Sequence, residues 1–451
     1  MKAGYKSRAS PKMASSSIFH TLTRVDRKTL SFTLSPTRYS YANTLRRIIQ
    51  TDIKILGFRA DILEDGSTSD VKVLKNSTPM SNEMLADRIG LLPVSMPQGV
   101  VSTWDKNSVL FKLHVKNETD DFRIVTASDF ECLEEVAGAD ERKRVPNTKF
   151  FKPNPITGET CMIAILKPMG DKEAEEIHIE AYASLGIGRE HTRFNPTSQC
   201  SYGYTLDKDP ARVLDLFQNW LREQKKVDPV ELEKMPERKA ILEREFRSLE
   251  IYRCFKVGDD GEANSFDFTV ESVGALDTYV ILTRAFSSLV ALSNKYASID
   301  RGELPENIEI RPAEARMKGF DIWIKEEDDT LGNMIQTWLD DNKVGRGVKE
   351  GGVTFVGYKI PHPLRNEMVF RIGVEDGKEA SARLAFAEAA KGCADMFAKW
   401  GSDFIALAAD RLEELAEPIS PKPLRGSEAG TVWEAHERVK SVGVKRVPGK
   451  K

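Results

Sequence analysis

The hydrophobic pattern of the first hundred residues predicts a small unit of strands and helices. Loose alternation of apolar and polar residues over 19–34 predicts one or two strands. Further strands are predicted around 55–63 and 71–74, followed by a helix that Ser81 opens. Between them, apolar residues at helical spacing predict an amphipathic helix over 41–53, buried through Tyr41, Leu45, Ile48, Ile49 and Ile53.

From about residue 100 to residue 209 the pattern changes to short alternating segments separated by Pro, Gly and Asn. This pattern predicts a β-rich insert, with its clearest strands at 109–115 and 177–182. Beyond it the pattern predicts two charged helical segments, a strand and a long amphipathic helix, at 211–224, 229–249, 266–273 and 277–296.

A second unit follows a polar linker at 299–306. The first unit and the second share the order strand, helix, strands, long helix. Ala42-Asn43 on the first predicted helix corresponds in place to Gly332-Asn333 on the second. Two related units in one chain predict a pseudo-dimer whose long helices pack together. The elements predicted for the second unit are 320–324, 330–339, 353–358, 368–374 and an Ala-rich helix at 378–415.

Composition restricts the class of protein. A length of 451 residues allows two to four compact units. The net charge of -3 provides no global basic field for nucleic acid, and no apolar run approaches the length of a membrane helix. Residues 1–17 are basic and polar without the apolar stretch of a secretory signal, so we expect a disordered tail there, with a transit peptide as the alternative.

The candidate ligands and nucleophiles do not form a known catalytic or metal pattern. The five cysteines lie far apart without a C-x-x-C pair, which favours reduced thiols in an intracellular compartment over a zinc or iron–sulfur site. His362 stands between two prolines with no second ligand at metal spacing. We therefore expect no metal and no cofactor.

Three features of the sequence carry an alternative chemical interpretation. Gly186 and Gly188 resemble a phosphate loop superficially, but the third glycine and the lysine of such a loop are missing. Glu190 and His191 are adjacent on an extended segment, so their side chains point to opposite faces. The acidic run 326–329 precedes a helix, and capping by Asp329 or Thr330 together with the helix dipole explains it without a metal.

One predicted strand and three motifs of the first unit carry a family resemblance. They are strand 268–274 and the motifs 41–49 (Tyr-Ala-Asn-Thr-Leu-Arg-Arg-Ile-Ile), 85–94 (Leu-Ala-Asp-Arg-Ile-Gly-Leu-Leu-Pro-Val) and 186–196 (Gly-Ile-Gly-Arg-Glu-His-Thr-Arg-Phe-Asn-Pro). With them the first unit resembles the alpha-type component of the large DNA-dependent RNA polymerases that are built from many subunits. This type includes bacterial alpha, its archaeal D-type counterpart and the third-largest eukaryotic subunit. The second unit resembles the small partner, the archaeal L-type protein and its eukaryotic counterpart, at 326–334 (Glu-Glu-Asp-Asp-Thr-Leu-Gly-Asn-Met) and 356–364 (Val-Gly-Tyr-Lys-Ile-Pro-His-Pro-Leu).

The resemblance covers roughly 17–415 and implies an α+β fold. Two alpha-like dimerisation units would form an intramolecular pseudo-dimer, with a β-rich insert domain in the first. The predicted organisation is a basic N-terminus, a discontinuous alpha/D-like domain, an insert domain, a linker, an L-like domain and a basic tail, at 1–17, 18–98 with 210–298, 99–209, 299–307, 308–416 and 417–451. The cysteine clusters of many cellular relatives and the C-terminal DNA-binding domain of bacterial alpha have no counterpart here.

The function that the resemblance implies is a non-catalytic assembly platform for the two largest polymerase subunits, although the whole polymerase is a nucleotidyltransferase. Further implied partners are small zinc-binding assembly subunits; DNA would be met only through the holoenzyme, and no membrane is involved. Fused D-like and L-like units resemble what large nucleocytoplasmic DNA viruses encode, which implies virion and host cytoplasm, or host nucleus. The rival hypotheses are an enzyme with its site around His191 and a nucleic-acid-binding factor using the basic tail.

The resemblance also implies roles for particular residues. Contact with the large subunits is predicted for Asn43, Arg46, Arg47, Arg88, Gly188, Glu190, His191, Asn195 and Pro196. The pseudo-dimer interface is predicted at Leu45, Ile49, Phe286, Leu289, Leu331, Asn333, Ile335, Leu339, Phe386 and Phe397. A structural turn is predicted at Gly357, Tyr358, Pro361, His362 and Pro363. Solvated surface charges remain the alternative for the arginine pair, and local backbone hydrogen bonds the alternative for the two asparagines.

Overall fold

A computed structural model describes residues 17–61, 69–95, 104–136, 141–168, 173–313, 317–344 and 352–415. The basic segments predicted at the two ends of the chain lie outside these residues, apart from Ser17. Within the described ranges, no helix combines the length and the apolar character needed to cross a membrane.

The first unit is built on a four-stranded antiparallel sheet in the order β1-β2-β13-β12. Its strands are β1 (Phe19–Arg24), β2 (Thr29–Leu34), β13 (Phe266–Ser272) and β12 (Thr197–Tyr204). Side chains of β2 and β13 alternate between buried and more exposed, as expected for a sheet with one face on the core. That face is covered by α1 (Tyr39–Thr51) and α6 (Thr278–Asn294).

The second unit repeats this plan. Its four-stranded antiparallel sheet has the order β14-β15-β17-β16. A shorter helix, α7 (Asp329–Asn342), and a long one, α8 (Glu379–Leu407), cover the sheet, and α9 (Ala409–Leu415) follows a break at Ala408. The strands are β14 (Ile308–Pro312), β15 (Gly319–Lys325), β16 (Val353–Lys359) and β17 (Glu367–Val374). The predicted α+β class is confirmed, while the single C-terminal helix predicted at 378–415 is two helices.

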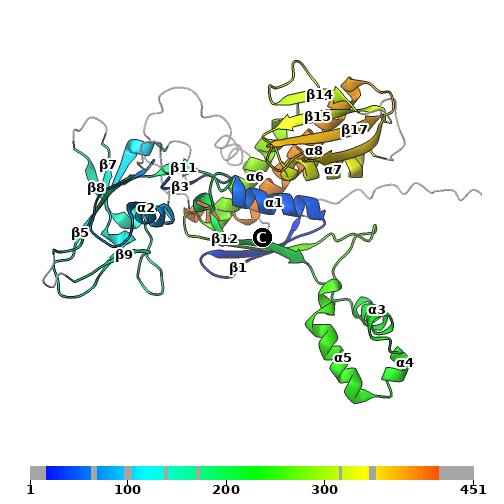
Figure 1. Cartoon of the computed structure of the whole chain (residues 1–451). Coiled ribbons are helices and arrows are strands. Elements are labelled where there is room, and N and C mark those ends of the chain that lie inside the picture. Colours follow the sequence, from blue (N-terminus) through cyan, green and yellow to red (C-terminus); the bar gives the residue numbers. More distant parts are fainter. Residues whose placement is uncertain are drawn as a thin grey trace, which may run out of the picture.

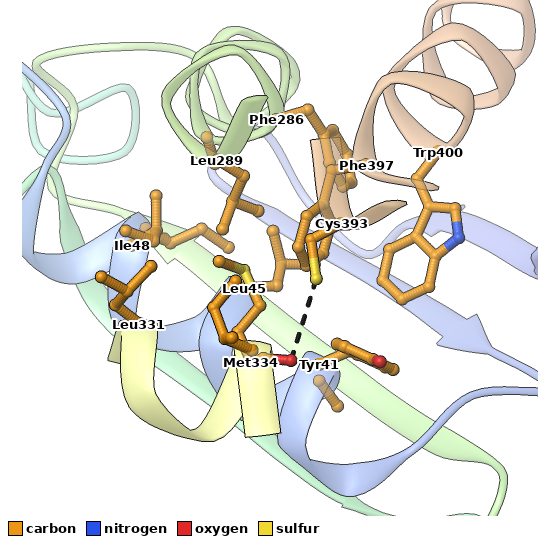
Figure 2. Packing of buried hydrophobic residues seen from close by; sticks show 14 of the residues in the cluster. Tyr41, Leu45, Ile48, Phe286, Leu289, Leu331, Met334, Cys393, Phe397 and Trp400 are labelled. Carbon is orange, nitrogen blue, oxygen red and sulfur yellow. Dashed lines mark hydrogen bonds between the residues drawn. The ribbon is translucent and has the colours of Figure 1, made fainter. Parts of the chain in front are cut away.

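The two units share one hydrophobic core, in which α1 and α6 of the first unit pack against α7 and α8 of the second. These helices lie between the two sheets (Figure 1). Figure 2 shows side chains of all four helices gathered in one cluster, among them Leu45 of α1, Leu289 of α6, Leu331 of α7 and Phe397 of α8. The rings of Tyr41 and Phe397 meet edge to face at a centroid distance of 6.2 Å. We call this four-helix contact the seam.

The residues predicted for the pseudo-dimer interface all lie on or beside the seam. Nine of them are buried members of the shared core, namely Leu45, Ile49, Phe286, Leu289, Leu331, Ile335, Leu339, Phe386 and Phe397. Asn333 is half-buried on α7. Burial of this apolar surface is the main stabilising term, worth about 25 cal/mol per Å² removed from water.

The insert has a separate core, and its limits differ from the predicted 99–209. Strands β4 (Val71–Asn76), β10 (Glu176–Tyr182), β5 (Val109–Lys116), β7 (Glu131–Glu134) and β8 (Lys143–Val145) form its sheet, and β6 (Arg123–Thr126) pairs with β9 (Met162–Leu166). Strand β4 and helix α2 (Asn82–Gly90), predicted in the first unit, bury Val71, Leu85 and Ile89 in this core. Strand β12, predicted in the insert, pairs with β13 of the first sheet. A short ribbon of β3 (Ile55–Gly57) and β11 (Ser184–Gly186) joins the two regions.

A third small core corrects the prediction that all of 210–298 belongs to the dimerisation domain. Helices α3 (Pro210–Trp220), α4 (Pro229–Leu232) and α5 (Pro236–Ser248) bury Trp220, Leu232 and Phe246 against one another. They project from the end of the first sheet (Figure 1). Their apolar side chains pack against one another in a separate core, so these three helices do not contribute to the seam.

Replacing Phe397 by Ala tests the energetic weight of the seam. The ring of Phe397 on α8 is fully buried and packs against Tyr41 of α1 across the seam. We therefore expect a loss of about 3–5 kcal/mol in the free energy of unfolding, measured by chemical denaturation. The matched control is Phe122→Ala on the insert, where the ring is 68% exposed and the change should stay within about 0.5 kcal/mol. Equal effects of the two substitutions would contradict the seam.

Candidate subunit-interaction site

The loop 186–196 lies against the C-terminal end of α1. A Cβ added to Gly188 would stand 2.0 Å from the carbonyl oxygen of Gln50, so only glycine allows this close approach. The backbone N–H of Arg189 donates to the carbonyl of Thr51 at 3.0 Å. The loop and the helix therefore form one surface.

An ion-pair cluster ties this surface to the second unit. Arg47 of α1 and Arg189 of the loop donate to one carboxylate oxygen of Asp328, at 3.2 and 3.0 Å. Arg189 also reaches Asp52, at 3.2 Å. Asp328 in turn caps α7 by accepting the backbone N–H of Thr330 at 2.8 Å. The cap expected at Asp329 or Thr330 is thus one residue earlier, because the carboxylate of Asp328 satisfies the free N–H of the first turn. We call these four side chains, Arg47, Asp52, Arg189 and Asp328, the Asp328 cluster.

The pKa of Asp328 reflects the same contacts. Burial alone would raise it, but the Thr330 hydrogen bonds and the guanidinium groups of Arg47 and Arg189 bring the pKa below its ordinary value of 3.8. The carboxylate is therefore ionised at neutral pH and balances two arginines at the seam.

The two neighbouring arginines on α1 make different contacts. Arg47, predicted to contact the large subunits, has its guanidinium engaged by Asp328 and lies 4.0 Å from Asp329, so its charge is used within the chain. Arg46 donates to Asn43 at 3.0 Å and to Gln50 at 2.8 Å and stays partly exposed. Asn43 thus orients Arg46 by accepting its hydrogen bond, a contact that neither hypothesis for this asparagine included.

The remaining predicted contact residues of the loop differ in their exposure and in their hydrogen-bond partners. Glu190 pairs with Arg59 at 2.7 Å and is 47% exposed. The ring of His191 is exposed, and its Nδ1 accepts the backbone N–H of Arg193 at the start of η5 (Thr192–Phe194). Asn195 accepts from the backbone of Thr197 at 3.0 Å. Pro196 is buried within the chain, so its side chain adds little to this surface.

Arg88 lies on α2, in the insert. Its guanidinium donates to the carbonyls of Ile163 and Met162, at 2.6 and 3.3 Å, and so holds α2 against β9. Asp87 on the same helix lies 3.8 Å from Arg193 of the loop. Helix α2 therefore borders the loop, although Arg88 itself is committed to the insert.

The predicted turn 357–363 is partly a strand. Gly357 and Tyr358 lie in β16, because this segment pairs with β17. The ring of Tyr358 packs on Gly332 of α7, where an added Cβ would lie 2.5 Å from the ring. Pro361, His362 and Pro363 form the exposed connection after the strand, and His362 accepts the backbone N–H of Leu364.

The chemistry available at these residues is that of protein contact. In the described part of the chain, no group of three or more His, Cys, Asp or Glu side chains could hold a metal ion. Burial raises the pKa of the Cys132 and Cys200 thiols to about 12, so neither is a thiolate at neutral pH. Glu190 and His191 have separate hydrogen-bond partners, Arg59 and Arg193.

Comparisons with known proteins point to one class. Residues 320–401 match the family described as the RNA polymerase Rpb3/Rpb11 dimerisation domain. The chain is 24% identical over 300 residues to a conjugation stage-specific protein of Tetrahymena thermophila, covering 60% of this chain and 90% of that protein. It is 22% identical over 288 residues to the DNA-directed RNA polymerases IV and V subunit 3B of Arabidopsis thaliana, covering 57% and 83%. Identity to the DNA-directed RNA polymerase subunit Rpo3 of Methanosphaera stadtmanae is 26% over 186 residues, covering 39% and 58%.

Two α+β units that pack through their helices, one of them matching this domain, place the chain among the RNA polymerase dimerisation-domain proteins. More particularly, the chain is of the alpha/D–L type, the type of the polymerase assembly subunits.

Substitution of Gly188 tests the fit of the loop on α1. Gly188→Ala should lower the free energy of unfolding by about 1–3 kcal/mol, because the new methyl group overlaps a backbone carbonyl. Gly203→Ala is the control, since nothing lies within 4 Å of an added Cβ there. Thermal or urea unfolding of both variants measures the difference. Equal stabilities would show that the loop does not pack as described.

The Asp328 cluster predicts a pH dependence. Because the folded-state pKa of Asp328 is below 3.8, its charge contributes stability above about pH 4 that is lost as pH falls through the folded pKa. Asp328→Asn keeps a good helix cap but removes the charge. The stability difference between the two proteins should be largest at neutral pH and shrink below about pH 4. A stability difference between the two proteins that stays constant as the pH falls below about 4 would contradict the cluster.

Proposed function

We propose that this chain is the non-catalytic assembly platform of a DNA-directed RNA polymerase, on which the two largest subunits are positioned. The observation that carries the proposal is the shared core of two dimerisation units within one chain. The relatives named above include polymerase third subunits, and the second unit matches the dimerisation domain.

The chain in this proposal is a fusion of a D-like unit and an L-like unit. The connection between α6 and β14 runs only from residue 295 to residue 307. A short connection makes docking of the second unit intramolecular, at an effective concentration of about millimolar. It also enforces equal numbers of the two units in every assembled polymerase. We infer a viral source from this fusion alone, with transcription in the virion and host cytoplasm, or in the host nucleus.

The face offered to the large subunits combines the loop 186–196 with the exposed side of α1. On this face the side chains of Glu190 and His191 are exposed and that of Arg46 is partly exposed. The guanidinium of Arg46 suits contact with carboxylates and carbonyls of a partner. Small zinc-binding assembly subunits are further proposed partners. DNA would be reached only through the assembled polymerase, and catalysis would belong to the large subunits.

Charge reversal at Arg46 tests this face. Arg46→Glu should reduce the large subunits recovered with the tagged chain at least tenfold, a loss of about 1.4 kcal/mol or more. Arg47→Glu does not serve here because Arg47 pairs with Asp328 inside the chain. The control is Arg27→Glu, an equal charge change in the exposed turn between β1 and β2. Undiminished recovery with Arg46→Glu would mean that the large subunits bind another surface of the chain. A wild-type chain that elutes without large subunits would overturn the proposed function.

A further inference from the structure

An open groove of about 680 Å³ crosses the seam at the end opposite the Asp328 cluster. It lies where the start of α1, the end of α7 and the second half of α8 meet, so both units line it. Tyr41, Trp338 and Trp400 supply aromatic walls. The rings of Tyr41 and Trp400 lie together at the edge of the packed core in Figure 2, 6.5 Å apart between centroids.

The groove has an excess of negative charge. Four carboxylates line it (Asp259, Asp260, Asp341 and Asp403) against two cations (Arg38 and Lys399), which leaves a side-chain charge of -2. Arg38 is already bound to Asp260 and Asp341. The rest of the groove therefore presents Asp259 and Asp403 to an occupant, together with Lys399, and keeps a net negative charge.

Two polar atoms of the groove lack a hydrogen-bond partner among the described residues. They are the hydroxyl of Thr37 and carboxylate oxygen Oδ2 of Asp403, both buried. A buried carboxylate oxygen without a donor is costly, and an ammonium or guanidinium group would satisfy it. The aromatic ring of Trp400, three residues before Asp403 on α8, also lines the groove and can add cation–π attraction for the same groups. The groove thus suits a lysine- or arginine-bearing peptide segment.

Such a segment directly precedes a groove residue in the sequence of this chain. Residues 1–16, outside the described part of the chain, include Lys2, Lys6, Arg8 and Lys12 and no Asp or Glu. Ile18, two residues further on, is part of the groove lining. Lys12 is six residues from Ile18, a reach of about 20 Å at most. A tether this short gives an effective concentration of about millimolar, which a free peptide would rarely match.

We propose that the groove is the docking site of the chain's own basic segment 1–16. Lysine or arginine side chains of the segment bind Asp403 and Asp259 beside the two tryptophans. The docked segment spans from β1 of the first unit to α7 and α8 of the second, and so straps the two units together across the seam. Because the contact is charged and partly exposed, it weakens as salt rises.

Zero-length carbodiimide cross-linking of the full chain tests the proposal, because the reagent joins a lysine amine only to a carboxylate in contact with it. Mass spectrometry should find Lys2, Lys6 or Lys12 joined to Asp259 or Asp403. Arg8→Glu should lower the yield of these links about fivefold, as expected for reversing one charge in four. Arg27→Glu, the same charge change in the exposed turn between β1 and β2, should leave the yield unchanged.

The occupant is identified by the origin of the cross-linked peptides. In an equal mixture of ¹⁵N-labelled and unlabelled chains, links within one isotope support the proposal. Links between isotopes assign the groove to a second copy and overturn it. Links scattered over other acidic surfaces, insensitive to Arg8→Glu, also overturn it. So does a groove carboxylate joined to a lysine of another protein when the chain is cross-linked together with its bound partners.

Discussion

Burial of the helical layer between the two sheets is the interaction on which the rest of the structure depends. Each sheet is covered on one side by one shorter and one longer helix, and such a pair alone would leave the outer helical surfaces in water. Packing α1 and α6 against α7 and α8 removes both surfaces at once. Extensive apolar contact of this kind is typical of obligate interfaces, and here the chain connection makes it permanent.

Charges set the register of this apolar contact. Helices α1 and α7 carry an arginine–aspartate pair at each end of their contact: Arg47 with Asp328 at one end and Arg38 with Asp341 at the other. These pairs join the start of each helix to the end of the other, so the helices run in opposite directions. Each pair contributes modestly to stability because it is partly exposed. These pairs fix the position of α1 relative to α7, because a shift of one helical turn would break both ion pairs.

Much of the fold could be predicted from local pattern. The 3.6-residue spacing of Tyr41, Leu45, Ile48 and Ile49 indicates which face of α1 is buried, and the repeated element order indicates two similar units. The limits of the insert could not be predicted in this way. Val71 pairs with a strand more than a hundred residues away, and antiparallel pairing over that distance leaves no local signal. The three helices α3–α5 were misassigned because an apolar stripe shows that a helix is buried but not against what.

The site shows the same division. Two of the motif segments meet in the fold, because Gly188 packs against Gln50 of α1, to which Arg46 donates a hydrogen bond. They did not distinguish Arg46 from Arg47, since that difference depends on Asp328, some 280 residues later. Arg189, Asp52 and Asp328 were missed for the same reason. Asp328 alone had a usable signal: an acidic residue two positions before Thr330 is well placed to cap the helix.

The proposed platform of two fused units requires a definite composition of the assembled polymerase. Native mass spectrometry of the complex purified through this chain measures that composition most directly. The account predicts one copy of the chain with two very large subunits and no second protein carrying a dimerisation domain. Two copies of the chain, an additional L-like protein, or the chain by itself would contradict it.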